Sequence, residues 1–522
     1  MSEPRNRAES AILALAVLGQ ILILLGHAGL LRAPLLVLAY GAAIAFALHR
    51  APWKRVALAG LAATPLVVLA LYPPVAFDET LYHLPYVEAF AKAHAIVWLP
   101  EARFPIFPHL HEVLCVGPFL AFGDVATHFV SVVELLLLGA LVASWPRSRE
   151  AGLLAVALCI GHPIVVQLAT VTYVDIALTL FVAAGFRAAD RDDPALAGFL
   201  FATACSVKYH GWYFAAFGVA YLLLFSARRG RALALFAAAF LAGLAPMYGR
   251  LIAETGNPLF PYFSQLFGDS PWSSGFPHRT DHVAKGLRLL WDITFARGRV
   301  NNQPPYSPLF ALAIGVVIVA AFRNRRAAFL AVLAVVFLAV FTYLPQDSRY
   351  LLPLVPLVSV VAAEAIAPRL TRRWTLALAL FAITPAFAYA GYRIARQGLP
   401  PTSAAALRRY LEEQVPEYRA LMRRRGRTFV CGAEQLHYYG GGEVIGEVFG
   451  PLDQERIIGD ATSSAELARR LRALDVRDLL ISRRACPEAW QQLPAAPEFE
   501  LVYADTGAAL WRIARRAPTN SR

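Results

Sequence analysis

Long apolar runs dominate the first three quarters of the chain. Runs long enough to cross roughly 30 Å of hydrocarbon follow one another as far as Arg393, with short polar turns between them. The first run is too long for the core of a signal peptide, and a second run follows it at once, so we interpret it as a membrane span. The pattern predicts about thirteen transmembrane helices, at 10–31, 33–49, 56–74, 124–145, 151–171, 174–187, 195–207, 211–226, 232–250, 306–322, 327–344, 350–367 and 374–392.

The charges in the turns predict the orientation. If the N-terminus is cytoplasmic, nearly every short turn on that side is basic, as the positive-inside rule requires. The opposite side then receives two long loops, 75–123 and 251–305, and everything after Arg393. The basic turns are His49–Arg55, Arg147–Glu150, Arg187–Asp193, Arg228–Arg231, Arg323–Arg326 and Arg369–Arg373.

Residues 195–226 test this threading, because they are too few for two ordinary spans. The segment is interrupted by Lys208-Tyr209-His210-Gly211. A pair of short helices broken there keeps all later loops on their expected sides, and polar backbone at membrane depth is tolerated where it lines a cavity. We therefore predict a broken pair, with Lys208 as a candidate site residue.

After Arg393 the composition becomes that of a water-exposed domain. Strand-like runs lie at Thr428–Cys431, Leu479–Ser482 and Phe499–Tyr503, and Ser463–Leu474 has a helical pattern with a serine N-cap. The alternation predicts a small α/β domain. Cys431 and Cys486 each follow a predicted strand, and either a disulfide or two separate buried thiols fits this placement.

The predicted fold is thus a polytopic α-helical membrane protein with a small C-terminal α/β domain. We divide the chain into an N-terminal transmembrane hairpin (1–55), a transmembrane catalytic domain (56–392) and the α/β domain (393–522). Composition agrees: 58% of the 522 residues are hydrophobic and 16% are charged, which speaks against a soluble enzyme. Much of the net charge of +13 lies in the cytoplasmic turns and therefore does not indicate nucleic-acid binding.

The first long outer loop carries the most suggestive acids. It begins Phe77-Asp78-Glu79 directly beyond a span. Neighbouring carboxylates on a helix point about 100° apart, so they do not form the facing pair of a retaining glycosidase. A single general base, Asp78, suffices when the leaving group is a phosphate. The alternative is a solvated loop start.

Other polar residues of the same loop are expected to line the cavity beside Asp78. These residues are Tyr82, His83, Arg103, His111 and Glu112. His109, His111 and Glu112 could instead bind a divalent metal, although nothing in their spacing requires an ion. In the second loop, Asn257 of Gly256-Asn257-Pro258 belongs to a turn that we expect to lie close to the membrane surface.

Two cations stand at helix ends within apolar surroundings, Lys208 and Arg349. Arginine binds phosphate oxygens with two parallel hydrogen bonds, so we expect both cations to face Asp78 across a cavity on the outer side. Snorkelling to the interface is the structural alternative for any single basic residue.

Taken together, these segments resemble the GT-C glycosyltransferases, and most closely the bacterial branch of protein O-mannosyltransferases and lipid A aminoarabinose transferases. The resemblance covers about residues 56–392. It rests on Phe77-Asp78-Glu79, Tyr173-Val174-Asp175, Lys208-Tyr209-His210-Gly211, Gly256–Pro261 and Arg349–Pro356.

The resemblance implies an inverting transfer of a sugar from a polyprenyl-phosphate-linked donor to a glycolipid, glycan or protein acceptor. The enzyme would lie in the bacterial inner membrane, with its C-terminal domain in the periplasm. Asp78 would then be the base, and Glu79 would orient it or the acceptor. Donor binding would fall to Lys208, Arg349, Asp175, Tyr209, His210 and Tyr350. No cofactor is implied.

Other functions fit the same topology. A ligase that moves a whole lipid-linked glycan uses similar loops and cations. A transporter of envelope precursors is a second alternative, but the chain shows no internal half-repeat. A binding subunit that recognises its partner through the outer domain is a third.

Overall fold

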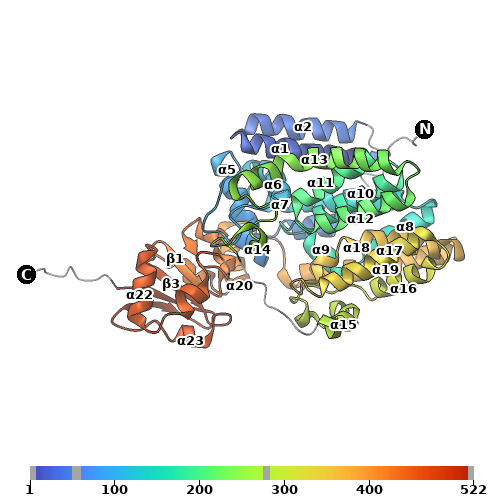
Figure 1. Cartoon of the computed structure of the whole chain (residues 1–522). Coiled ribbons are helices and arrows are strands. Elements are labelled where there is room, and N and C mark those ends of the chain that lie inside the picture. Colours follow the sequence, from blue (N-terminus) through green and yellow to red (C-terminus); the bar gives the residue numbers. More distant parts are fainter. Residues whose placement is uncertain (1–6, 50–59, 274–281, 449, 515–522) are drawn as a thin grey trace, which may run out of the picture.

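The computed structural model describes residues 7–49, 60–273, 282–448 and 450–514. It consists of a helical body and a small C-terminal domain that adjoins one end of that body (Figure 1). The helices of the body are α1 (Arg7–His27), α2 (Ala33–Leu48), α4 (Thr64–Ala70), α5 (Leu84–Ala93), α6 (Leu110–Phe122), α7 (Val125–Ser144), α8 (Arg149–Ile160), α9 (Pro163–Leu168), α10 (Asp175–Asp190), α11 (Pro194–Val207), α12 (Gly211–Phe225), α13 (Arg229–Thr255), α14 (Ser264–Phe267), α15 (His282–Phe295), α16 (Leu309–Ala321), α17 (Arg325–Phe341), α18 (Leu354–Ile366) and α19 (Arg372–Gln397).

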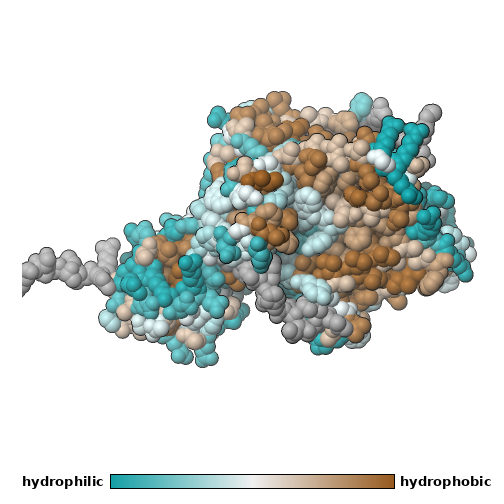
Figure 2. Space-filling view, viewed as in Figure 1, coloured by the Kyte–Doolittle hydropathy of each residue, from teal (hydrophilic) through white to brown (hydrophobic). Residues whose placement is uncertain are grey.

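Hydrophobic side chains cover much of the body. In the described residues, four helices are long and apolar enough to cross a membrane, namely α1, α7, α13 and α19, and several shorter apolar helices lie beside them. Figure 2 shows a brown hydrophobic band over the body, between hydrophilic residues on the C-terminal domain and others at the opposite end. This distribution fits a protein embedded in a bilayer, while the number of thirteen spans stays a prediction.

The predicted span 151–171 is broken in the structure. Helix α8 ends at Ile160 and α9 begins at Pro163, so one span becomes two helices. Gly161 lies at the break, where a β-carbon would come within 2.0 Å of the Ala382 carbonyl oxygen of α19. The glycine therefore allows α19 to approach this turn. The predicted span 56–74 begins outside the described residues, and its described part forms α4 from Thr64 onwards.

The pair of short helices predicted around Lys208 is present. Helix α11 ends at Val207, Lys208 has extended backbone (φ −160°), and α12 begins at Gly211. A β-carbon on Gly211 would lie 2.5 Å from the Cys205 backbone nitrogen, so only glycine lets α12 fold back against the end of α11. The break places Lys208 at the end of a buried helix.

Two of the turns predicted to be basic and cytoplasmic, Arg187–Asp193 and Arg323–Arg326, lie at the same end of the body as the start of α1. Arg191 forms an ion pair with Glu9 at 2.7 Å, and Arg326 forms one with Asp190 at 3.0 Å. The N-terminal helix and the turns after α10 and α16 are therefore neighbours, as the threading required. The C-terminal domain contacts the first long loop, which was expected at the other end.

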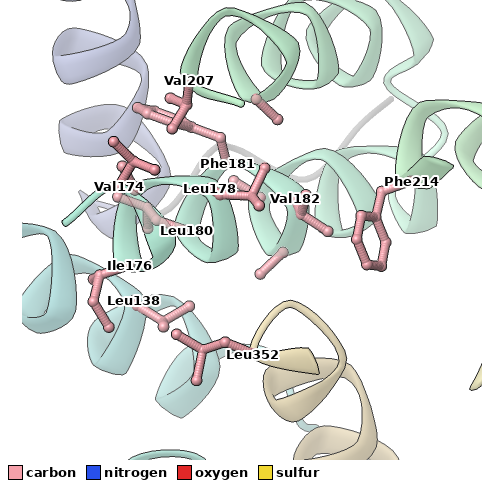
Figure 3. Close-up of a cluster of buried hydrophobic side chains, with 14 of the residues drawn as sticks. Leu138, Val174, Ile176, Leu178, Leu180, Phe181, Val182, Val207, Phe214 and Leu352 are labelled. Carbon is pink, nitrogen blue, oxygen red and sulfur yellow. The ribbon is translucent and has the colours of Figure 1, made fainter. Parts of the chain in front are cut away.

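Helix α10 lies at the centre of the body. Its apolar residues are buried against α7, α11 and α12 (Figure 3). Because neighbours pack on all its sides, its first residue, Asp175, is held in a fixed position inside the protein. The labelled residues of this core are Leu138, Val174, Ile176, Leu178, Leu180, Phe181, Val182, Val207, Phe214 and Leu352.

The C-terminal domain is the expected α/β unit. Its five-stranded sheet has the order β2-β1-β3-β5-β4, with β1 (Thr428–Cys431), β2 (Val444–Ile445), β3 (Asp478–Ser482), β4 (Phe499–Ala504) and β5 (Ala508–Ile513). Strand β1 is parallel to β2 and β3, and β5 is antiparallel to β3 and β4. Helices α20 (Ala404–Gln414), α21 (Tyr418–Leu421), α22 (Ser464–Ala473) and α23 (Glu488–Gln491) accompany the sheet.

Two details of this domain answer questions that the sequence raised. The Ser463 hydroxyl accepts a hydrogen bond from the Glu466 amide at 3.2 Å, so it caps α22 as predicted. Cys431 and Cys486 form a disulfide across 55 residues of chain. The disulfide is therefore the correct one of the two alternatives.

Candidate functional site

The first outer loop opens with a π-helical turn, η1 (Glu79–His83), which runs directly into α5. Pro85 has no N–H and cannot donate to the Leu81 carbonyl, so the regular α-helical pattern is interrupted here. Instead, the Leu84 amide bonds to the Glu79 carbonyl five residues back. Such turns widen a helix locally and are frequent at functional sites.

Asp78 immediately precedes this turn and lies at the centre of a group of polar contacts. Its Oδ2 accepts a hydrogen bond from the Tyr82 hydroxyl at 3.0 Å and another, very short, from Arg349 Nη2. Its own amide donates to the Tyr173 hydroxyl at 3.0 Å. Burial alone would raise the pKa of Asp78, but the charge of Arg349 prevails and lowers it to about 2.

Arg349 comes from the other end of the chain, in the short helix η3 (Ser348–Leu351). Its Nε lies 2.8 Å from Asp347 Oδ2, and its Nη1 lies 3.8 Å from Asp175 Oδ2. Its side chain is 7% exposed. Burial alone would lower the pKa of Arg349, but Asp347 and Asp78 raise it well above the usual range. The guanidinium is a permanent charge that three carboxylates surround.

Lys208 and Asp175 form a second ion pair beside the first. Lys208 Nζ donates to Asp175 Oδ1 at 2.8 Å and lies 4.5 Å from the centre of the Tyr350 ring. An ammonium group has three donors, and the bond to Asp175 uses one of them. The Lys208 side chain is 18% exposed, whereas that of Asp175 is 1% exposed, so the lysine is the more open member of the pair.

Glu79 points to different partners from Asp78. Its Oε1 accepts hydrogen bonds from His128 Nε2 at 2.7 Å and from the Thr172 amide at 2.6 Å. These bonds tie η1 to α7 and to the segment that carries Tyr173. Glu79 therefore positions the loop and does not face the same point as its neighbour. A cavity of about 190 Å³ lies beside Glu79, with Arg393 also in its lining.

Several other predicted residues lie close to this centre. The His210 ring packs 4.6 Å from that of Tyr350, and burial lowers the pKa of His210 to about 3. Tyr209 turns its hydroxyl away, donating to the Phe260 carbonyl at 2.6 Å. Asn257 Nδ2 donates to the Tyr262 carbonyl at 2.8 Å. Asn257 therefore shapes its own turn rather than the centre.

In the structure, His109, His111 and Glu112 have different partners. His111 Nδ1 pairs with Glu134 at 3.1 Å, whereas Glu112 pairs with His83 at 2.6 Å. The His109 ring packs against aromatic rings, 4.3 Å from that of Phe107. The three side chains are thus directed apart, and within the described ranges no group of three or more histidine, cysteine or acidic residues is arranged to hold a metal. His111 consequently belongs to the core and does not line the site.

The C-terminal domain covers the first loop. The Tyr438 hydroxyl donates to Asp124 at 3.0 Å, and the Tyr439 hydroxyl donates to the Pro74 carbonyl. Arg103 of the loop lies 3.5 Å from Glu447 of the domain. Burial raises the pKa of Glu447 to about 8. The domain is therefore packed directly against the segment that carries Asp78.

Sequence reasoning missed part of this site. Tyr173 lies in the motif Tyr173-Val174-Asp175, and Asp347 lies two residues before Arg349, but neither residue was predicted to belong to the site. Their positions beside Asp175 and Arg349 were the available signal. Glu447 gave no signal, because nothing in its sequence neighbourhood indicates contact with a loop more than 300 residues earlier.

The fold is similar to that of ArnT from Cupriavidus metallidurans. In its apo state that protein aligns with a TM-score of 0.57 and 13% identity, over 88% of this chain and 97% of that chain. Bound to undecaprenyl phosphate, it aligns with a TM-score of 0.54 and 14% identity, over 88% and 98%. The oligosaccharyltransferase AglB from Archaeoglobus fulgidus, in complex with an inhibitory peptide and a dolichol-phosphate, gives a TM-score of 0.49 at 12% identity, over 90% and 76%.

At the level of sequence, a family model described as SF2091/S2213 matches residues 406–512, within the C-terminal domain. No curated protein matches the chain. Because ArnT is a GT-C glycosyltransferase, the structural similarity shows that the chain has the GT-C fold. The fold that the sequence resemblance implied is confirmed.

Proposed function

Starting from the GT-C fold, we propose that this protein transfers a sugar from a polyprenyl-phosphate-linked donor to an acceptor of the cell envelope. The observation that carries the proposal is the buried arrangement of Asp78 with Arg349, next to Asp175 with Lys208. It joins a carboxylate and two cations in one place. An acceptor base and a phosphate site require these groups.

In this proposal the two cations bind the donor phosphate. Arg349 and Lys208 stabilise the negative charge that develops on the phosphate as it leaves. Asp347 and Asp175 hold these two side chains in place, so their orientation is set before the donor arrives. One of the two ArnT structures has undecaprenyl phosphate bound, which makes a lipid phosphate a suitable first probe.

In this proposal Asp78 is the base that deprotonates the acceptor. The acceptor oxygen or nitrogen forms a bond to the anomeric carbon of the sugar while the bond from that carbon to the phosphate oxygen breaks. The acceptor proton moves to Asp78, and the phosphate leaves without needing a proton. One displacement inverts the anomeric centre, which agrees with a site in which Glu79 is engaged elsewhere.

We place the reaction at the periplasmic side of the bacterial inner membrane, with a glycolipid, glycan or protein as acceptor. Two of the basic turns meet through the ion pair of Arg326 with Asp190, and hydrophilic residues lie on the C-terminal domain and at the opposite end of the body (Figure 2). Basic turns remain cytoplasmic. A reporter enzyme that is active only in the periplasm, fused after residue 522, tests this placement. Activity of a cytoplasmic reporter at the same position would contradict it.

The decisive experiment measures transfer by the purified protein. A panel of polyprenyl-phosphate sugars is offered with an envelope extract, and the product is identified by mass spectrometry. Asp78→Asn is expected to lower transfer by at least about 100-fold and to leave donor binding intact. Glu88→Gln is the matched control, because Glu88 is an acid of the same loop that forms an ion pair with Lys92. Full activity of Asp78→Asn would overturn the assignment of the base.

The same panel of donors distinguishes the proposed transferase from a ligase that moves a whole lipid-linked glycan. A ligase would use an oligosaccharide linked to polyprenyl diphosphate and would leave the monophosphate-linked monosaccharides unused. Transfer from a monosaccharide donor by the wild-type protein, absent when donor or protein is omitted, supports the proposed function.

A further inference from the structure

His83 and Glu112 form a buried pair close to the candidate base. His83 Nδ1 lies 2.6 Å from Glu112 Oε1, and both side chains are almost fully buried. An ionised carboxylate accepts hydrogen bonds only, so this contact places a proton on Nδ1. In neutral His83, Nε2 therefore carries the lone pair that can accept a proton.

The imidazole of His83 is in contact with both tyrosines that contact Asp78. Its ring centre lies 4.3 Å from that of Tyr82 and 5.7 Å from that of Tyr173. Tyr82 donates to Asp78, and Tyr173 accepts from its amide. The π turn explains this placement, because residues five apart on a π helix lie near one another on the same face. Asp78 and His83 have this spacing.

We propose that His83, oriented by Glu112, is a second acid–base residue of the transfer reaction and takes up the proton that Asp78 removes from the acceptor. This inference rests on the proposed function. The acceptor proton moves first to Asp78 and then to His83 Nε2, and His83 becomes an imidazolium ion whose charge Glu112 balances. The proton finally passes to water, and Asp78 and His83 return to their starting states.

The contacts of Asp78 explain why a second residue is needed. Its Oδ2 already accepts two hydrogen bonds, one of them from the permanent charge of Arg349. Arg349 also keeps the pKa of Asp78 at about 2, so this carboxylate orients the acceptor well but holds a proton poorly. Glu112 Oε2 has no hydrogen bond among the described residues. A positive charge on His83 therefore stabilises the negative charge of the Glu112 carboxylate.

Other charged and titratable groups surround this pair. On its own segment His83 faces Asp78 and Tyr82, and Arg349 is bound to Asp78. From α6 and the segment before it come Glu112, His109 and His111, Tyr173 precedes α10, and His437 of the C-terminal domain lies against the Leu81 backbone. The charge of any of these groups can shift the midpoints of the pH–activity profile. The experiment therefore compares the profiles of variants with that of the wild type.

The molecule contains a matched control for a purely structural role. His111 and Glu134 form a second buried histidine–glutamate pair at 3.1 Å. His111 lies on α6, one residue before Glu112, and its contacts are with Glu134 and Cys115 instead of the tyrosines beside Asp78. Replacing either pair by two glutamines removes one buried ion pair and leaves no unpaired charge.

The experiment measures kcat, KM and the pH profile for wild type, His83→Gln, His83→Gln/Glu112→Gln and His111→Gln/Glu134→Gln, together with the melting temperature of each. We expect kcat to fall about 100-fold in both His83 variants, with both KM values within about 3-fold, and the rising limb of the profile to disappear. The His111/Glu134 variant should melt as early as the His83/Glu112 variant but keep its kcat. Added imidazole should restore part of the activity of His83→Ala.

Three results would overturn the inference. They are a wild-type kcat in His83→Gln/Glu112→Gln, a kcat loss that equals that of the His111/Glu134 variant, and an unchanged rising limb in His83→Gln. Failure of the proposed function is distinguishable, because the wild-type protein would then produce no product in the same assay.

Discussion

Replacement of Glu447 by glutamine tests how the C-terminal domain is held on the first loop. Glu447 is 1% exposed and lies 3.5 Å from Arg103 and 3.4 Å from His437. Neither of its carboxylate oxygens has a hydrogen bond among the described residues. Burial raises its pKa from 4.5 to about 8, so at neutral pH the native carboxyl is protonated. Glutamine has the same shape and the same neutral charge.

The sign and size of the effect follow from the two pKa values. Between pH 4.5 and pH 8 the folded protein holds a proton on Glu447 that the unfolded chain has released. Wild-type stability therefore falls as the pH rises through this window. At 1.36 kcal/mol per unit, the loss is below about 1 kcal/mol at pH 5, about 3 kcal/mol at pH 7 and about 5 kcal/mol above pH 8. The glutamine of Glu447→Gln does not titrate, so this variant does not lose that stability as the pH rises.

The assay is thermal unfolding of the full-length protein in detergent at pH 5, 7 and 9. The melting temperature of Glu447→Gln should equal that of the wild type at pH 5 and exceed it increasingly at higher pH, by about 2–4 °C per kcal/mol for a domain of this size. Glu443→Gln is the control, because Glu443 is an acid of the same domain with 58% of its side chain exposed. If Glu447→Gln is instead less stable at pH 9, the carboxylate is ionised and paired with Arg103, and the reasoning fails.

Two further predictions concern the ion pairs and the disulfide. Arg349→Gln leaves Asp78, Asp347 and Asp175 without their common cation and should cost about 3–5 kcal/mol; adding Asp347→Asn should recover part of the loss in melting temperature, and no recovery would show that the carboxylates do not repel one another. Reduction of Cys431–Cys486, or its replacement by two serines, releases a loop of 55 residues and should cost about 4 kcal/mol, seen as earlier unfolding of the C-terminal domain by hydrogen exchange; equal exchange in the two redox states would contradict this.

The parts of this structure that local physics determines could be predicted from the sequence. The break at Lys208–Gly211 followed from the number of residues available to cross a membrane. The placement of the turns Arg187–Asp193 and Arg323–Arg326 on one side followed from their charge. Asp78, Arg349 and Lys208 were each expected to face one cavity. The structure pairs Asp78 with Arg349, and Asp175 lies between Arg349 and Lys208.

The parts that depend on tertiary packing could not be predicted. Nothing in the sequence around His111 shows that Glu134 is its partner, and the neighbouring histidines therefore suggested a metal site. The hydrogen bonds of Glu79 Oε1 with His128 and with the Thr172 amide required the positions of α7 and the α9–α10 connection. The contact of Glu447 with Arg103, which lies more than 300 residues earlier in the chain, depends on how the whole C-terminal domain docks.

The π turn at Glu79–His83 also bears on how this chain could change over generations. An α-helical turn closes four residues back, so the π turn contains one residue more than a regular helix needs. Losing a single codon here would remove that extra residue and turn Asp78 by about 100° relative to α5. The core and the C-terminal domain would keep their own contacts. A relative that lacks one residue in this loop should thus be a folded, stable membrane protein whose carboxylate no longer meets Arg349. Deletion of one residue would thus leave the fold in place and remove the contact between Asp78 and Arg349.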